Sequence, residues 1–270
     1  MELIKPATFD DFRRLIEPLV LADEAEHGLI YGIAGTSSPP ADAYCALALD
    51  GDAVVAAAIR TIERTALSLE KAPGAIALIP ADAIRDPGLR GLLGPPQSLR
   101  AFAEASGREW RAGRGMTIYE CRSVSAGDRV AGLRRVAGVA ERDLLVSWAK
   151  AFTSEALGVI SARGEAEAAA DRYIANGTMH LWTVEGQPVA CAAALGPTPR
   201  GIRIGGVYTA PESRGRGYAS ALVADLTQLQ LDRGRAFVYL YADRANPTSN
   251  SIYQRLGYRR VADADDLWLV

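Results

Sequence analysis

Residues 207–220, VYTAPESRGRGYAS, pass from a strand-like run through a proline and two glycines into an apolar helical pattern. Gly215 and Gly217 allow the main chain to approach a ligand where a Cβ atom would clash. Arg214 and Arg216 bring positive charge to the same turn. A helix N-terminus adds unpaired N–H groups and about half a positive charge. The expected ligand is therefore a phosphate or a pyrophosphate.

Two common phosphate-binding turns fit this stretch poorly. A P-loop needs a Gly-Lys-Ser/Thr sequence, which is absent. A Rossmann turn places its glycines directly after the strand, whereas here residues 210–213 separate the strand from the glycines. Arg214-x-x-Gly217-x-Ala219 instead resembles the Q/R-x-x-G-x-G/A signature of the GNAT superfamily, the acyl-CoA-dependent N-acyltransferases. The resemblance implies that the turn binds the pyrophosphate of CoA.

A second motif follows in the order that this family shows. The strand-like run 236–243, AFVYLYAD, leads into residues 246–258, NPTSNSIYQRLGY. The latter resembles the family's N-x-x-(small)-x-x-(L/I)-Y-x-x-x-G-(F/Y) segment. The resemblance covers roughly residues 130–270, and the whole chain resembles a subgroup in which a degenerate N-terminal GNAT-like half precedes an intact one.

The resemblance implies an acetyl-CoA site. In the family, the end of the fourth strand pairs with the pantetheine arm, and the turn binds the pyrophosphate through N–H groups. Two asparagines lie along the CoA arm, and a tyrosine lies near the thioester sulfur. The matching residues are Val207, Tyr208 and Thr209 on the strand, Arg214, Gly215, Arg216, Gly217, Tyr218 and Ala219 in the turn, then Asn246, Asn250 and Tyr253.

Structural roles are open for several of these side chains. Asn246 before Pro247 is also a good helix N-cap, and this role is compatible with a ligand contact. Tyr253 lies at helical spacing from Leu256 and could belong to the core. Trp148 and Phe152, further upstream, are expected to pack rather than to contact substrate.

Direct attack of an amine on the thioester requires an oxyanion donor, an acid and a base. A main-chain N–H near Tyr208 can stabilise the oxyanion. Tyr253, whose phenol has a reference pKa of about 10, can donate its proton to the departing thiolate, whose reference pKa is about 8.5. Many family members carry a glutamate on the fourth strand, but residues 202–207 contain none. Glu155 is the candidate base, and a chain of water molecules is the alternative.

The predicted elements of the second half form a mixed sheet with helices on its faces. We expect strands at 133–139, 202–209, 236–241 and 266–270, a hairpin over 181–195, and helices at 143–156, 165–175, 218–232 and 247–256. The first half shows an opening helix, a hairpin over 46–59 and a strand at 66–70, but no glycine turn at 79–84.

The two hairpins contain Asp50-Gly51 and Glu185-Gly186, and they lie half the chain length apart, which favours a tandem duplication. The predicted fold is therefore α/β (α+β), a tandem GNAT-like fold in which each half is a mixed, mostly antiparallel sheet flanked by helices. We place a degenerate domain at 1–126 and an acetyl-CoA-binding domain at 127–270. Residues 108–115 are expected to form a solvated linker out of the first half.

Composition excludes several classes of function. The chain has 30 basic and 32 acidic residues, so nothing predicts nucleic acid or a membrane as a partner. Its three cysteines are far apart, which favours reduced thiols, a cytoplasmic location and no metal site.

The predicted function is N-acetyl transfer from acetyl-CoA to a primary amine. The acceptor is a small molecule or an amino group of a peptide or protein, and the sequence does not choose among them. A non-catalytic acyl-CoA-binding sensor or scaffold is the alternative, because the carboxylate on the fourth strand is missing.

Overall fold

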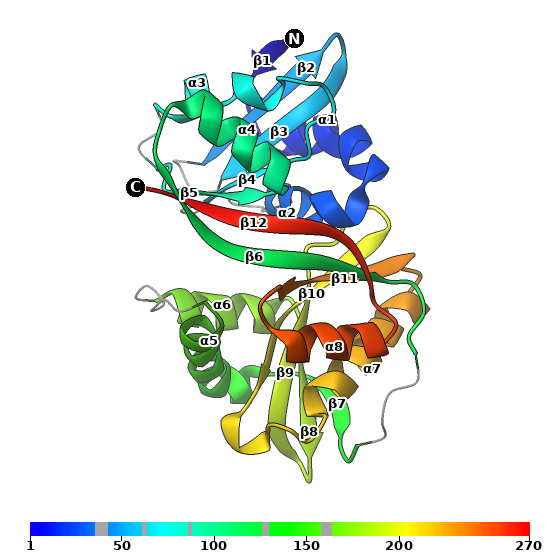
Figure 1. The fold of residues 1–270 in the computed structure, drawn as a ribbon. Coiled ribbons are helices and arrows are strands. Elements are labelled where there is room, and N and C mark those ends of the chain that lie inside the picture. The colour runs from blue at the N-terminus through cyan, green and yellow to red at the C-terminus, as the bar shows by residue number, and fades with distance from the viewer. Residues whose placement is uncertain (36–42, 61–63, 86–87, 126–129, 158–163) are drawn as a thin grey trace.

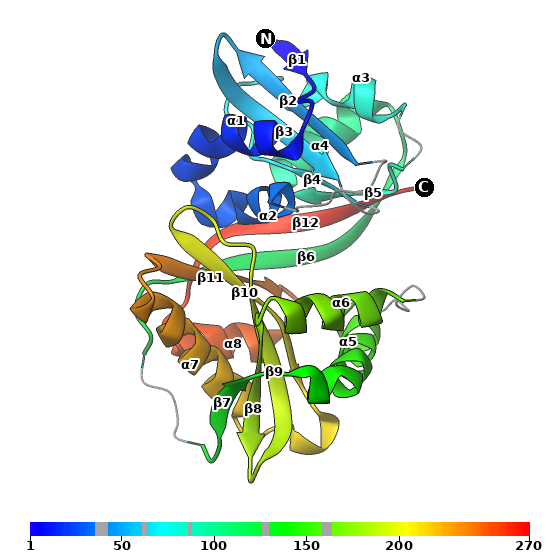
Figure 2. The ribbon, with the colours of Figure 1, turned by 180° about the vertical axis from the view of Figure 1, so that it is seen from behind.

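A computed structural model describes residues 1–35, 43–60, 64–85, 88–125, 130–157 and 164–270. Its strands form one twelve-stranded sheet in the order β1-β2-β3-β4-β5-β12-β6-β11-β10-β9-β8-β7, with helices on both faces (Figures 1 and 2). Most neighbouring strands are antiparallel, and the exceptions are the β4–β5 and β10–β11 pairs. The predicted α/β (α+β) class is therefore confirmed.

The strands of the first half are β1 (Glu2–Ile4), β2 (Tyr44–Asp50), β3 (Ala53–Arg60), β4 (Arg64–Leu67), β5 (Gly91–Gly94) and β6 (Trp110–Cys121). Those of the second half are β7 (Leu133–Val136), β8 (Met179–Val184), β9 (Gln187–Leu195), β10 (Gly201–Thr209), β11 (Phe237–Asp243) and β12 (Arg259–Leu269). The α-helices are α1 (Phe9–Ala22), α2 (Glu24–Ala34), α3 (Pro80–Ala83), α4 (Pro96–Ser106), α5 (Arg142–Leu157), α6 (Glu165–Ala175), α7 (Tyr218–Asp232) and α8 (Pro247–Arg255).

The two halves repeat the same order of elements. Each has a strand, two helices, three strands, a helical segment, a strand, a helix and a last long strand. In each half the strand before the helical segment pairs in parallel with the strand after it. This repetition agrees with the predicted tandem architecture.

The last strands of the two halves cross over within the sheet. β12 pairs with β5 of the first half, and β6 pairs with β11 of the second half, while β6 and β12 also pair with each other. In Figure 1 both strands run through the middle of the molecule. The predicted linker at 108–115 is therefore wrong, because residues from Trp110 onward form β6. The predicted domain boundary at residues 126 and 127 lies outside the described residues.

Successive side chains of a strand point to opposite faces of the sheet, so neighbouring residues pack into different hydrophobic cores. In the first half Leu47 and Ile59 pack under α1 and α2, whereas Ala46 and Ala58 pack under α4. In the second half Ile202 and Ile204 pack under α7 and α8, and other residues of the sheet pack under α5 and α6. Within the described residues, no helix is long and apolar enough to cross a membrane.

Helix α2 joins the first half to the strand that carries the predicted site. Its buried Glu24 accepts hydrogen bonds from Arg200 N at 2.6 Å, Gly201 N at 3.0 Å and Arg200 Nε at 2.7 Å, and from the Thr198 hydroxyl. Gly28 lies so close to Tyr239 of β11 that a Cβ atom there would approach the tyrosine ring within 2.4 Å. Helix α2 therefore fixes the start of β10 and the face of β11.

Candidate active site

Strands β10 and β11 separate halfway along their length. They pair in parallel only from Gly201 with Phe237 to Ile204 with Leu240. Beyond Ile204, β10 continues to pair with β9 as far as Thr209, with an irregularity between Gly205 and Tyr208. One side of the main chain of residues 205–209 is thus open toward the space between the two strands.

Two amides of β10 are directed to this open side. Ala210 N–H donates to Val189 O at 3.2 Å, so this N–H and that of Tyr208, two residues earlier, are directed toward β9. Because N–H groups alternate along a strand, those of Val207 and Thr209 are directed away from β9. The strand therefore offers donors where the sequence predicts contacts with an extended ligand.

A cleft of about 360 Å³ lies beside the same part of β10, between α5, α6 and the sheet. Apolar side chains form much of its lining, among them Leu145, Trp148, Phe152 and Met179. Met116 of β6 also lines it, so the first half contributes to the wall. The cleft is large enough for a small ligand with an apolar body.

The glycine turn lies at the end of the open segment. Gly215 and Gly217 have φ values of 74° and 80°, and α7 begins directly after them at Tyr218. No side chain caps this helix, and none of the amides from Gly215 to Ala219 has an acceptor among the described residues. Exposed, unpaired N–H groups at a helix N-terminus are the arrangement that binds an anion.

Glu155 lies at the rim of the cleft rather than in its lining. Its Oε2 accepts a hydrogen bond from Arg214 Nη2 at 2.6 Å, and its Oε1 accepts one from the Tyr208 hydroxyl at 3.4 Å. Tyr208 itself lines the cleft and packs against Trp148. The structure thus connects the candidate base to the cleft and to the turn.

Tyr253 packs between two other tyrosines, with ring centroids 6.3 Å from Tyr119 and 5.9 Å from Tyr258. Its hydroxyl has no hydrogen-bond partner among the described residues, and Tyr253 is not among the residues that line the cleft. Burial raises the pKa of Tyr253 to about 12. The phenol therefore stays protonated at neutral pH and can act as a donor.

The two asparagines have structural partners. Asn246 is the N-cap of α8, and its Oδ1 accepts a hydrogen bond from Ser249 N at 3.1 Å. Asn250 accepts a hydrogen bond from the Tyr119 hydroxyl at 2.9 Å and donates one to Asp243 O at 2.9 Å. Their contact with a ligand stays a prediction.

Sequence reasoning missed several residues of the cleft. Trp148 and Phe152 line it, although they were expected only to pack. Tyr173 of α6 and Tyr241 of β11 also line it, and so does Arg203, in the middle of β10. The sequence alone does not mark Arg203 as a site residue, because an arginine in a strand that faces a cleft looks the same as one that faces solvent.

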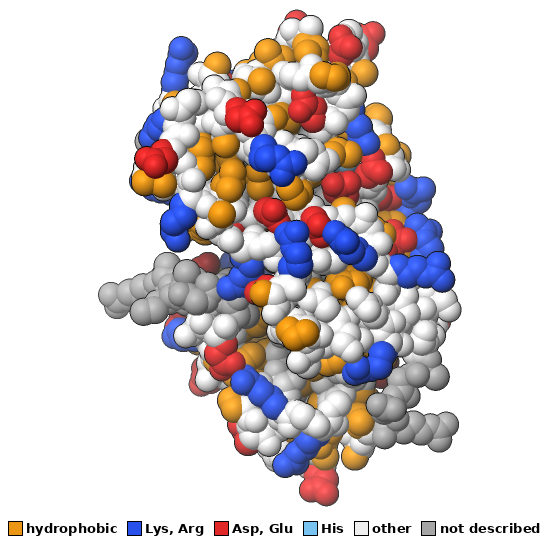
Figure 3. Space-filling model, in the orientation of Figure 1, with side chains coloured by type: hydrophobic (Ala, Val, Ile, Leu, Met, Phe, Trp, Pro, Cys, Tyr) orange, Lys and Arg blue, Asp and Glu red, His pale blue; other side chains and the backbone are white. Residues whose placement is uncertain are grey.

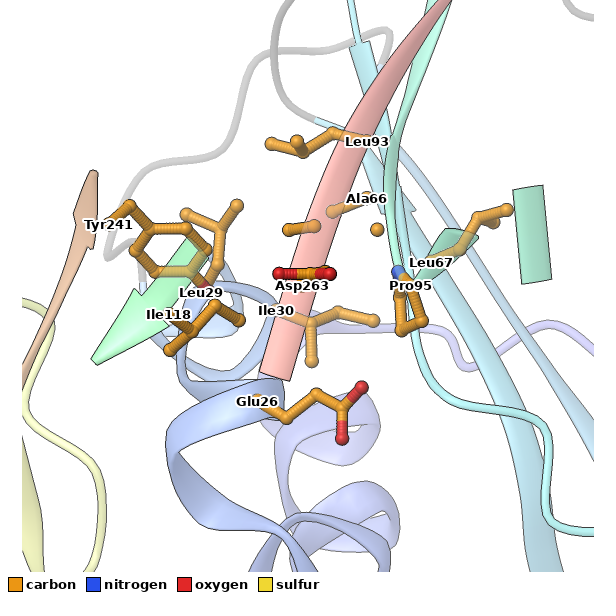
Figure 4. Close-up of a pocket in the computed structure, with 12 residues that line it drawn as sticks. Glu26, Leu29, Ile30, Ala66, Leu67, Leu93, Pro95, Ile118, Tyr241 and Asp263 are labelled. Carbon is orange, nitrogen blue, oxygen red and sulfur yellow. The ribbon is translucent and has the colours of Figure 1, made fainter. Parts of the chain in front are cut away.

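The corresponding part of the first half holds a much smaller pocket. This pocket has a volume of about 20 Å³ and is lined from α2, β4, β5, β6, β11 and β12 by residues that include Ile30, Leu93 and Pro95 (Figure 4). The helix that follows β4 there, α3, has four residues, whereas α7 has fifteen. The features that favour CoA binding are therefore found in the second half.

Comparison with known proteins agrees with this geometry. Residues 144–258 match the model of the Acetyltransferase (GNAT) family. This part of the chain thus matches a GNAT-family domain, and the match supports acyl transfer as the class of activity. No curated protein matches the sequence.

Several solved structures share the fold over nearly the whole chain. A GNAT-family acetyltransferase from Colwellia psychrerythraea is 11% identical with a TM-score of 0.65, covering 100% of this chain and 99% of its own. A GCN5-related N-acetyltransferase from Sphaerobacter thermophilus is 17% identical with a TM-score of 0.62, covering 98% and 94%. A tandem GNAT protein from the clavulanic acid biosynthesis pathway is 14% identical with a TM-score of 0.59, covering 100% and 98%. At these identities the comparison shows the fold alone, and that fold is the predicted tandem GNAT-like one.

Proposed function

We propose that this protein transfers an acetyl group from acetyl-CoA to a primary amine. The observation that carries the proposal is the continuity of the open side of β10 with the glycine turn before α7. Together they present unpaired N–H groups along a path that begins at Val207 and ends at Ala219. The family match of residues 144–258 supports an acyl-CoA as the donor.

The residues present fit a CoA molecule. Val207 and Thr209 can hydrogen-bond an extended pantetheine arm as a neighbouring strand would. The amides of residues 215–219 can bind the pyrophosphate, because positive φ values at Gly215 and Gly217 remove Cβ atoms from the approach. Arg214 and Arg216 add positive charge at the exposed rim.

In the proposed reaction the amine nitrogen forms a bond to the thioester carbonyl carbon and the carbon–sulfur bond breaks. The proton lost by the amine passes to Glu155 or to water, and the thiolate takes a proton from Tyr253. A main-chain N–H of β10 stabilises the oxyanion. We assign this last role to Val207, which adjoins the predicted Tyr208, because the N–H of Tyr208 is directed toward β9.

The proposed acceptor is a small amine or an exposed amino group of a peptide. Basic and acidic side chains are interspersed over the face shown in Figure 3, a pattern that does not favour a strongly charged partner on this face. A cytoplasmic location, expected from the cysteine usage, stays a prediction.

Release of CoA thiol from acetyl-CoA in the presence of a mixed panel of amines tests the proposal. An N-acetyltransferase releases thiol faster with at least one amine than with buffer alone. Binding of CoA without amine-dependent release would favour the sensor or scaffold instead.

A further inference from the structure

Arg203 lies in the cleft, and none of the described residues supplies it with a counter-ion. It occupies the middle of β10, where its neighbours Ile202 and Ile204 enter the core under α7. Its side chain therefore belongs to the opposite face of the sheet, and it lines the cleft under α5 and α6. Within the described residues Arg203 takes part in no ion pair and no side-chain hydrogen bond, although it is half-buried.

Tyr173 of α6 and Tyr241 of β11 line the same cleft as Arg203. Burial raises the pKa of Tyr173 and Tyr241, and the positive charge of Arg203 is the first of the causes that oppose burial at both phenols. A guanidinium thus lies in an otherwise largely apolar cleft that two tyrosines also line.

A half-buried cation without a partner lowers stability, because burial removes water that no protein acceptor replaces. Most other arginines with partly buried side chains in the described chain have carboxylate partners, such as Arg64 with Asp266 and Arg134 with Asp225. Glu165 is the one acidic side chain among the described residues of the cleft lining, and it makes no ion pair with Arg203. A bound ligand can therefore supply the hydrogen-bond acceptor that Arg203 lacks among the described residues.

We propose that Arg203 binds a carboxylate of the acceptor, so that the preferred substrates are amino-acid-sized amines with an acidic group and an apolar body. A guanidinium binds a carboxylate through two parallel hydrogen bonds, and the apolar lining formed by Trp148 and Phe152 suits a nonpolar side chain. The positive charge of Arg203 repels polyamines, which are themselves cations, so polyamines are disfavoured as substrates. This inference rests on the proposed acetyl transfer and names the substrate class of that site.

The test compares thiol release from acetyl-CoA with five amines. Phenylalanine carries the carboxylate, whereas phenylalaninamide and phenethylamine lack it. 1-Amino-2-phenylethylphosphonic acid has a phosphonate in place of the carboxylate. Putrescine represents polyamines. The wild-type protein should use phenylalanine with a kcat/KM about tenfold to a hundredfold above the two amines that lack a carboxylate, mainly through KM. A phosphonate that outperforms the carboxylate overturns the assignment to a carboxylate.

Three variants assign the effect to the side chain. Arg203→Met should remove the preference for phenylalanine over phenylalaninamide, measured as the ratio of their kcat/KM values. Arg203→Lys should keep part of the preference, because it keeps the charge without the planar fork. Arg259→Met removes an exposed arginine of β12 outside the cleft and should leave the preference unchanged.

The outcomes separate the two proposals. If the wild type turns over phenethylamine or putrescine as efficiently as phenylalanine, the role of Arg203 is wrong and acetyl transfer stands. If no amine promotes thiol release, the proposed function fails, and this inference fails with it. If Arg203→Met does not fold, the wild-type comparison and Arg203→Lys still decide.

Discussion

Glu155 on α5 and Arg214 before α7 form an ion pair with 2.6 Å between Oε2 and Nη2. Each side chain is 46% exposed, so solvent screens the pair and its contribution to stability is at most about 1 kcal/mol. The main effect of the ion pair is to fix the positions of the two side chains. The pair holds a carboxylate beside Tyr208 and joins the helix over the acceptor cleft to the turn that is proposed to bind pyrophosphate.

Glu155→Gln should lower turnover by about tenfold to a hundredfold if Glu155 takes the proton of the amine. The KM for acetyl-CoA should change little, because the glutamine can still accept a hydrogen bond from Arg214. Glu165→Gln, at the cleft lining, is the comparison, and steady-state kinetics at several pH values is the measurement. Full activity of Glu155→Gln, or a larger loss in Glu165→Gln, would remove Glu155 as the base.

Gly217→Val should weaken CoA binding by at least about tenfold without unfolding the protein. The residue has a φ of 80°, which a branched side chain disfavours, and a Cβ atom would lie 3.1 Å from Val130 at the mouth of the turn. Gly234→Val is the matched control, because Gly234 has a φ of 89° beyond the far end of α7. Calorimetry should find weakened binding only in the first variant, and equal affinities would exclude phosphate binding by this turn.

Tyr253→Phe should lower turnover by about tenfold to a thousandfold with little change in melting temperature. The hydroxyl has no hydrogen-bond partner among the described residues, so its loss leaves no buried group unpaired. Because the pKa of Tyr253 is about 12, the effect should persist across the neutral range instead of producing an alkaline limb there.

Tyr258→Phe is the control for this prediction. Its buried hydroxyl lies 2.6 Å from Thr227 Oγ1, so its removal should cost about 1 kcal/mol of stability and leave turnover intact. If Tyr253→Phe instead shows wild-type turnover at every pH, Tyr253 serves packing only.

Glu24→Gln should reduce the free energy of unfolding by about 2 kcal/mol at pH 7, since it removes a buried carboxylate from four hydrogen bonds. Burial raises the pKa of Glu24, but the hydrogen bonds from Thr198, Arg200 and Gly201 outweigh burial and leave the pKa below its ordinary value of 4.5. A lowered carboxyl pKa stabilises the fold above that ordinary value, and this stabilisation disappears as the pH falls through the folded-state pKa. The difference between the two proteins should therefore shrink below about pH 4.5.

Urea unfolding at a series of pH values measures this difference. His27 and His180, whose pKa values burial lowers to about 4, destabilise both proteins alike as the pH falls from 6.5, so only the difference is diagnostic. Asp171→Asn removes an exposed partner of Arg142 and should cost at most about 1 kcal/mol. A difference for Glu24→Gln that is no larger than this control would contradict the proposed role of Glu24 in joining the halves.

Local signals in the sequence predicted much of the second half. Helices α6 and α7 have the predicted bounds, because Asn176-Gly177 ends one and the glycine turn begins the other. The acetyl-CoA contacts assigned from the motifs stay predictions. The structure adds that Gly217 has a positive φ, which glycine adopts without strain.

The exchange of β6 and β12 could not be predicted in the same way. Strand pairing depends on packing between segments that are far apart in the chain, and residues 108–115 contain two glycines and three arginines, a composition typical of exposed segments. The structure places this stretch against β12, where Asp265 pairs with Gly115 and Trp268 with Arg111. Arg203 escaped notice for a related reason, since only the fold reveals that its face of β10 lies in a cleft.

Mass spectrometry of the amine after incubation with acetyl-CoA labelled in the acetyl group tests the central claim most directly. The account predicts that the label appears in an amide of the amine, with one CoA thiol released for each acetyl group transferred, and that Gly217→Val reduces both together. Tight CoA binding with no label in any amine, or label transfer that Gly217→Val leaves unchanged, would contradict acetyl transfer at this site.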